Sequence, residues 1–439
     1  MLNRQMLPSH LRTIEKEERL MNELDNHAAK QSDPAVTYKA FVQQMSDWLN
    51  GGELPGTASQ DLRFVLELQK QKLQSLGLNM KYELPGTGSG KINTGGISYS
   101  DRIFTNSIIG GYRNLARSIG GTQHLYTDDI SLSAVIQDLK TGTQPCNDLA
   151  LCCPHCGAPS TLGELQAGCK HCGTHFLMSE LYPKVMNYFI FENHDSERQK
   201  RKNKRDLIRL ITMCILPLTV IEIILSLLTK QDRSPIFSVL LGLFGGIFGG
   251  AMFGGILFVF KKLFEVFGLM GKGLRGGGHT VSTLLHANQI KKNDPEFSSE
   301  YFRDKIISLF RMAVYSKDAA ELACCRCRCP ETASDIIEAQ LFNFNINSCR
   351  ITDMVCDAEV TLYLDCLHCT NGKIINKSDK YVMHLRKRIK RPTELGFSFA
   401  AVSCPSCGAS FDGRNVKACP YCHSAYLHEE HDWIVTDIK

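Results

Sequence analysis

The sequence lacks a strong excess of charge of either sign. Its 439 residues hold 50 Lys and Arg against 45 Asp and Glu, for a formal net charge of +5. The positive residues also concentrate beside apolar segments. Nucleic-acid binding would instead require them along an extended face. The composition therefore favours a membrane as partner and argues against DNA or RNA.

The start of the sequence lacks the apolar core that a secretory signal peptide needs. MLNRQMLPSHLRTIEKEERLMNEL is polar along most of its length. We therefore expect the 19 cysteines to face a reducing compartment, where thiols persist and disulfides are rare. Eight of these cysteines fall in paired CxxC motifs, an arrangement typical of metal ligands.

The paired CxxC motifs predict two zinc ribbons, at residues 151–176 and 404–422. CPHCG is followed by CKHCG in the first, and CPSCG by CPYCH in the second. Four thiolates suit tetrahedral Zn²⁺ and leave no open position for catalysis, so we expect two structural ions. CPHCGAPS also aligns with CPSCGAS, which raises the hypothesis of a divergent internal repeat. The predicted ligands are Cys153, Cys156, Cys169, Cys172, Cys404, Cys407, Cys419 and Cys422.

Two apolar runs near the middle of the chain, at 207–228 and 235–260, predict a transmembrane hairpin. Each reaches the ~20 residues that a helix needs to cross a bilayer. Only TKQDRS separates them, so both ends of the hairpin should emerge on the same side of the membrane. The preceding SERQKRKNKRD carries six Lys or Arg residues, which predicts that both termini are cytoplasmic.

Glycine recurs at every fourth position of the second run and marks one face of the expected helix. Such a face allows close packing against a neighbouring helix, and a self-associating pore is the sharper alternative. The residues are Gly242, Gly246, Gly250 and Gly254. Glu222 in the first run is a carboxylate at membrane depth and thus a candidate functional residue. Pro217 nearby frees a backbone carbonyl, so a local polar contact explains Glu222 equally well.

Three motif-like segments fail on spacing. PGTGSGK is one residue short of a phosphate loop and lacks its hydroxyl, and HEEH at 428–431 spaces its histidines by three instead of the four of a zinc protease. Cys366 and Cys369 lie in a predicted strand, where residues three apart point to opposite faces. The run CCRCRCP, from Cys324 to Pro330, fits no template and leaves a metal or redox sensor as an alternative function.

The remaining segments predict a multidomain α+β protein. Helical periodicity in FVQQMSDWL, DLRFVLELQKQKLQSLGL and SDRIFTNSIIGGYRNLARSI predicts a mostly helical soluble region over 1–150. We expect a basic juxtamembrane segment at 177–206 and a flexible linker at 261–294. A capped amphipathic helix should open a C-terminal domain at 295–439, followed by strands in AEVTLYLD, KYVMHLRKRI and GFSFAAVS, with TNGK as a hairpin turn.

The segment FSSEYFRDKIISLFRMAVYSKDAAEL resembles the opening helix of the Tim-forty-four-like domain. The resemblance covers 295–439 and implies a cone-like α+β domain, similar to the nuclear transport factor two superfold, with the second ribbon inserted. It implies an apolar pocket for lipid or peptide and no catalytic residues. Bacterial relatives that combine this domain with ribbons and membrane spans imply a location in the plasma membrane of a bacterium.

These observations together predict a membrane-anchored scaffold or adaptor that is not an enzyme. Its partners would be the lipid bilayer and a protein or peptide, with self-association left open. The alternatives are a small oligomeric channel or transporter that uses the glycine face, and a cysteine-based metal or redox sensor.

Overall fold

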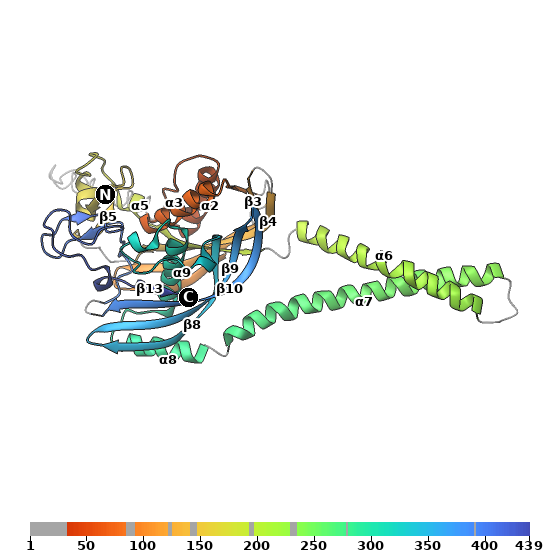
Figure 1. Cartoon of the computed structure of the whole chain (residues 1–439). Coiled ribbons are helices and arrows are strands. Elements are labelled where there is room, and N and C mark those ends of the chain that lie inside the picture. The colour runs from red at the N-terminus through yellow and green to blue at the C-terminus, as the bar shows by residue number, and fades with distance from the viewer. Residues whose placement is uncertain are drawn as a thin grey trace, which may run out of the picture. The chain divides into compact units, whose positions relative to one another are not determined.

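The chain divides into two units, and one is inserted into the other. The computed structural model describes residues 33–84, 93–121, 125–140, 147–192, 197–228, 235–277, 280–389 and 392–439. The larger unit joins the chain before residue 193 to the chain after residue 280, and the smaller unit is the helical segment between them (Figure 1). The C-terminal region is therefore not a separate domain as predicted, because it shares one core with the N-terminal half.

The described part of the first half of the larger unit begins with α2 and α3, which an antiparallel sheet follows. Ser59 caps the second helix by accepting a hydrogen bond from Leu62 N. The strand order is β1-β3-β4-β7, and β2 pairs with the remainder of the β3 edge that β1 leaves free. The elements are α2 (Pro34–Leu49), α3 (Gln60–Ser75), β1 (Asn79–Glu83), β2 (Asn93–Ser100), β3 (Phe104–Gly120), β4 (Leu125–Leu139) and β7 (Lys184–Glu192).

The second half repeats this arrangement. Ser298 caps the long helix in the same way as Ser59, and a four-stranded antiparallel sheet of order β8-β9-β10-β13 follows. Positive φ angles at Asn371 and Gly372 form the β9–β10 turn, which confirms the TNGK prediction. The elements are α8 (Thr280–Lys291), α9 (Ser299–Tyr315), β8 (Ile336–Thr352), β9 (Val355–Thr370), β10 (Lys373–Arg388) and β13 (Ile434–Ile438).

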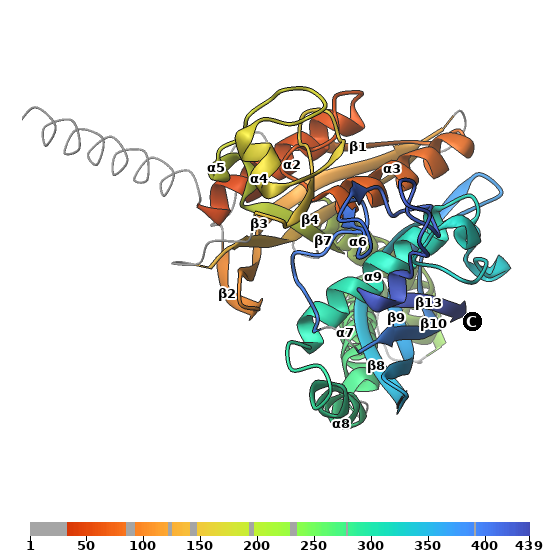
Figure 2. The ribbon, with the colours of Figure 1, turned by 90° about the vertical axis from the view of Figure 1, so that its left-hand side faces the viewer.

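A ribbon lies at the same place in each half, before the last strand of the sheet. The first contains β5 (Ala150–Cys152), β6 (Pro159–Thr161), α4 (Leu162–Ala167) and α5 (Met178–Leu181). The second contains β11 (Val402–Ser403), β12 (Ser410–Phe411) and the 3-10 turn η3 (His428–Glu430). The similarity between the two ribbon sequences thus extends to helix, sheet and ribbon in the same order along the chain. Figure 2 labels the helices and sheet strands of both halves.

Several predicted segment assignments are wrong. The first 150 residues are not mostly helical, since β1 to β4 occupy much of 79–139. In β3, Leu115, Arg117 and Ile119 are buried and alternate with partly exposed residues, and the arginine hid this period of two from the apolar pattern. The 177–206 segment includes β7, and α7 and α8 fill most of the expected 261–294 linker.

Two smaller predictions are also affected. Of GFSFAAVS only Val402–Ser403 is strand. The PGTGSGK segment and the TKQDRS turn lie outside the described residues.

The inserted unit consists of α6 (Glu197–Leu228) and α7 (Pro235–Gly277), packed along each other. Each is long and apolar enough to cross a membrane, over 200–226 and 239–263. Large apolar side chains such as Met213, Phe244 and Phe248 are more than 70% exposed, which distinguishes these helices from buried core helices.

The four periodic glycines of α7 face α6. A methyl group on any of them would meet the α6 backbone, at Ile223, Thr219, Ile215 and Ile211 in turn. Gly249, in contrast, has nothing within 4 Å of such a methyl group. The glycine face is therefore filled by the partner helix of the same hairpin.

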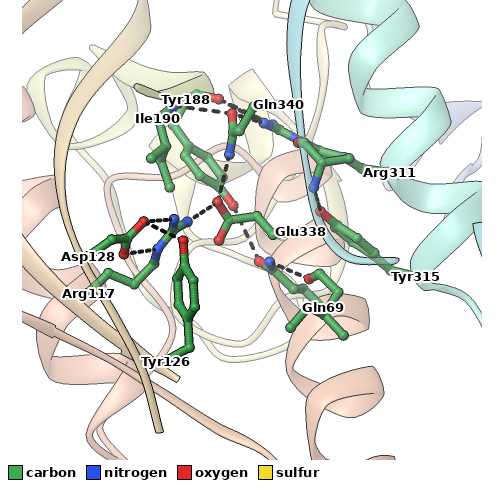
Figure 3. Close-up of polar contacts among 12 residues, drawn as sticks. Gln69, Arg117, Tyr126, Asp128, Tyr188, Ile190, Arg311, Tyr315, Glu338 and Gln340 are labelled. Atoms are coloured by element: carbon green, nitrogen blue, oxygen red, sulfur yellow. Dashed lines mark hydrogen bonds and ion pairs between the residues drawn. The ribbon is translucent and has the colours of Figure 1, made fainter. Parts of the chain in front are cut away.

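The two halves of the larger unit meet around two buried arginines, Arg117 of β3 and Arg311 of α9 (Figure 3). Arg117 bonds Asp128 of the neighbouring strand and also Glu338 of β8, in the other half. Arg311 donates to Ala339 O (2.9 Å) in its own half. The same guanidinium crosses the seam to Asn187 Oδ1 (2.8 Å), so the two arginines bind the halves together.

Further hydrogen bonds extend this seam beyond the two ion-pairing and backbone contacts of the arginines. Gln340 Oε1 accepts from Arg311 (2.7 Å) and from Ile190 N of β7 (3.1 Å). Gln69 of α3 donates to Ile337 O (3.0 Å), which connects the first half to β8 a second time. These side-chain hydrogen bonds fix how β7 lies against β8, although Glu338 Oε2 is buried without a hydrogen-bond partner.

We expect Arg117→Leu to lower the free energy of unfolding by about 3–5 kcal/mol, because it leaves the 1%-exposed Glu338 carboxylate without its cation. Arg386→Leu is the matched control, since it breaks an ion pair with Asp357 whose side chains are 39% and 46% exposed, and should cost about 0–1 kcal/mol. Denaturant titration of the protein in detergent measures both. Equal losses would contradict a seam held by buried charge.

Candidate metal centres

The first ribbon is built from two turns that each present a pair of sulfur atoms. Cys153 N donates to Ala158 O (2.8 Å) and Gly157 N to Cys153 O (2.8 Å), which closes the turn between β5 and β6. The second turn closes in the same way around Cys169, after α4. Gly157 and Gly173 adopt φ of 75° and 73°, the left-handed conformation that glycine takes without strain.

The second ribbon repeats these contacts. Cys404 N donates to Ala409 O (2.9 Å) and Gly408 N to Cys404 O (2.9 Å), with φ of 73° at Gly408. His423 occupies the place of Gly173 and adopts φ of 58°. His423 is not among the residues whose donor atoms group at this site.

The sulfur atoms of each ribbon lie at the spacing of a tetrahedral metal site. The Sγ–Sγ distances are 3.7 Å for Cys153–Cys172 and 3.8 Å for Cys156–Cys169. In the second ribbon they are 3.6 Å for Cys404–Cys422 and 3.8 Å for Cys407–Cys419. A tetrahedron with metal–sulfur bonds of ~2.3 Å has edges of ~3.8 Å. Each predicted set of four cysteines therefore forms a group that could hold one metal ion.

A hydroxyl beside each site favours the thiolate form of one ligand. Thr174 Oγ1 lies 3.3 Å from Cys172 Sγ, and this hydrogen bond lowers the pKa of that thiol to about 5. Ser424 Oγ occupies the equivalent place, 3.3 Å from Cys404 Sγ, and lowers the pKa of the Cys404 thiol to about 5. The thiolate is the form that coordinates metal, so these hydrogen bonds favour coordination by one thiol of each set, whereas burial raises the pKa of the Cys153 thiol in the first.

The two ribbons lie side by side and differ in how they join the core. Strands β5 and β6 contact β11 and β12, and Cys152 Sγ donates to Ala400 O (3.3 Å). Cys153 and Cys169 belong to the main core, whereas Cys404 and Cys419 form a small core with Val402, Phe411 and Tyr426. Loss of metal from the first ribbon would thus disturb the packing of the main core directly.

Cavities gather where the ribbons meet. One of about 230 Å³ lies between the start of the first ribbon and the segment 394–403 that leads into the second. Its lining is mixed, with the apolar side chains of Ile103 and Phe397 and the carboxyl groups of Asp148 and Glu394. Phe397 also lines two smaller cavities beside it.

The remaining cysteine and histidine motifs lie in β9, in η3 and in the segment 324–329. Cys366 packs into the main core and Cys369 against the second core cluster, which confirms that they point to opposite faces of β9. HEEH is a short 3-10 turn instead of a loop or strand edge. In the CCRCRC run, Cys324 and Cys325 are buried, and Arg326 N donates to Val435 O (2.8 Å).

Glu222 lies over Gly245 of the partner helix, within van der Waals distance of where a methyl group would stand. It is exposed on the hairpin surface.

One cluster was missed by the sequence reasoning. Cys366, His368 and Asp379 bring their donor atoms within 4.8 Å of one another. The sequence DCLHC already places Cys366 and His368 on one face, since residues two apart in a strand share a face. The prediction considered only the CxxC pair, Cys366 and Cys369.

Searches of protein-family models, curated proteins and solved structures find no match to this chain.

We expect Cys156→Ser to reduce the metal content of the purified protein by one ion per chain, because it removes one of four ligands from the first ribbon. Cys152→Ser is the matched control, since Cys152 lies beside the site and bonds the Ala400 carbonyl instead. Elemental analysis by mass spectrometry measures both variants. An unchanged metal content in Cys156→Ser would show that the four sulfurs do not act as one site.

Proposed function

We propose that the chain is a membrane-anchored binding protein without enzymatic activity, whose two ribbons hold Zn²⁺ and shape the binding end. The observation that carries the proposal is the exposed apolar hairpin inserted into a unit with one shared core. A unit whose core joins both flanking halves does not need the hairpin for its own folding. The hairpin then serves as an anchor in the bilayer.

The charge pattern supports an orientation with both ends in the cytoplasm. Lys and Arg concentrate in 198–205, before the apolar part of α6, and Lys261 and Lys262 follow the apolar part of α7. Cytoplasmic ribbons would remain reduced, as zinc thiolates require. The proposed location is the plasma membrane of a bacterium.

We place the binding site at the junction of the ribbons. The cavity there combines apolar walls with carboxyl groups and lies between two segments that the ribbons constrain. Its mixed lining suits a short protein segment that carries apolar and basic side chains. A lipid headgroup region is the alternative occupant.

The arrangement of α9 against β8 and its neighbours supports the resemblance to the Tim-forty-four-like domain, with a helix against an antiparallel sheet. The first half has the same order of elements, so the proposal extends to two related halves. A channel is the less favoured function, because the glycine face that suggested it is filled within one hairpin.

We expect the larger unit to fold without the hairpin. Replacing residues 193–280 by a Gly-Ser linker of about 20 residues should release the protein from membranes and leave its cooperative unfolding and its ribbon-bound zinc unchanged. Fractionation, circular dichroism and elemental analysis measure the three properties. A variant that stays in the membrane fraction, or that loses cooperative unfolding, would contradict the anchor.

We expect photo-crosslinking residues at Glu394 and Ser403 to capture a protein partner in living cells, because both line the cavity at the ribbon junction. Lys39 of α2 is the control position, exposed and outside the cavity lining. Mass spectrometry identifies the adducts. Capture of lipid alone at both sites would show that the occupant is lipid and not protein. Equal capture at Lys39 would contradict a specific binding site at the cavity.

A further inference from the structure

A compact polar cluster lies on the core-facing side of the second sheet, away from both sets of ribbon cysteines. Cys366 and His368 project from one face of β9, and Asp379 projects from the same face of β10, since it pairs directly with Leu364. Cys366 is fully buried, and the side chains of His368 and Asp379 are each 8% exposed. Three different donor elements, sulfur, nitrogen and oxygen, thus meet in a nearly dry place.

The imidazole of His368 has a carboxylate at each ring nitrogen. Nδ1 lies 2.8 Å from Asp335 Oδ1, and Thr370 Oγ1 holds the other Asp335 oxygen at 2.7 Å. Nε2 lies 2.5 Å from Asp379 Oδ2. Because a neutral imidazole has only one N–H, donation from Nδ1 to Asp335 leaves Nε2 as an acceptor that faces another acceptor. At 2.5 Å the two atoms share a second proton, and a metal ion that replaced this proton would move them apart to the ~3.3 Å edge of a tetrahedral site.

The thiol of Cys366 is the third donor in this cluster. Its sulfur lies within 4.8 Å of the donor atoms of His368 and Asp379 and forms a hydrogen bond with Asp379, so loss of the thiol proton would leave three donor atoms around one point. We propose that Cys366 Sγ, His368 Nε2 and Asp379 Oδ2 form a third metal site, for a divalent transition ion such as Zn²⁺. A mixed sulfur, nitrogen and oxygen set suits borderline ions of this class and not Mg²⁺ or Ca²⁺.

Asp335 is a positioning residue in this site. A metal-ligating histidine commonly donates its other N–H to a carboxylate, which fixes the ring and raises its basicity. Asp335 and Thr370 supply that arrangement for His368. Lys377 approaches the other oxygen of Asp379 (2.9 Å to Oδ1), so Oδ2 remains directed at the cluster.

The site differs in kind from the ribbons. It offers three protein ligands where each ribbon offers four, so one coordination position is left for water or another small ligand. The full burial of Cys366 argues against the alternative of a nucleophilic cysteine, because a substrate cannot reach its sulfur. The inference is independent of the proposed anchoring and binding function.

The test is the zinc content of the full-length protein purified in detergent, measured by mass spectrometry. We expect three ions per chain, two from the ribbons and one from this cluster. Cys366→Ser and Asp379→Asn should each remove one ion, whereas Cys369→Ser, the thiol on the opposite face, should remove none. Asp335→Asn should weaken the affinity for that ion by about 10–100-fold in competition with a chelator.

Two ions in the wild-type protein, with both ribbons shown to be loaded by their own variants, would overturn the proposal and assign the cluster to a doubly protonated imidazole. This outcome does not depend on whether the cluster variants fold. Replacement of zinc by Co²⁺ gives a second readout, because the wild-type minus Cys366→Ser difference spectrum should contain one thiolate-to-cobalt charge-transfer band. A flat difference spectrum would equally overturn it.

Discussion

Two buried guanidinium groups, those of Arg117 and Arg311, lie where the halves of the larger unit meet, and the positions of both ribbons depend on them. A guanidinium can be buried only when its donors find acceptors in the correct geometry. Arg117 meets that need with Glu338 of the other half, and Arg311 does so with Asn187 and Gln340. Hydrophobic contact alone would tolerate sliding of β7 along β8, but these bonds do not.

The repeated order of elements explains why the ribbons become neighbours. Each ribbon interrupts its sheet before the last strand, and the seam brings the two sheets together with α3 and α9 in contact. The two ribbons can then share an interface at Cys152 and Ala400, which are 248 residues apart in sequence. A cavity of mixed polar and apolar lining lies at this junction.

The inserted hairpin and the larger unit treat their apolar side chains in opposite ways. The hairpin exposes its apolar side chains and fills its own glycine face, whereas the larger unit buries its apolar side chains in clusters to which both halves contribute. A bilayer would solvate the exposed apolar side chains of the hairpin, and water would solvate the larger unit, whose apolar side chains are buried. The chain can therefore leave and re-enter the larger unit without disturbing its core.

Local features of this protein could be read from the sequence alone. CxxC pairs identify the ribbon ligands because four sulfurs at fixed spacing are a local requirement of one ion, and long apolar runs identify α6 and α7 because bilayer thickness sets helix length. Ser59 and Ser298 mark helix starts, and Asn371-Gly372 marks a turn, since caps and turns involve only neighbouring residues.

Only the tertiary structure decided the remaining features, because they depend on partners distant in sequence. The alternation in β3 was hidden by Arg117, whose burial makes sense only beside Glu338, 221 residues away. The grouping of Cys366, His368 and Asp379 depends on the pairing of β9 with β10. The shared core depends on contacts between two halves that the insertion separates in sequence. No local pattern encodes such contacts, since the energy that stabilises them is gained only when both segments have already folded.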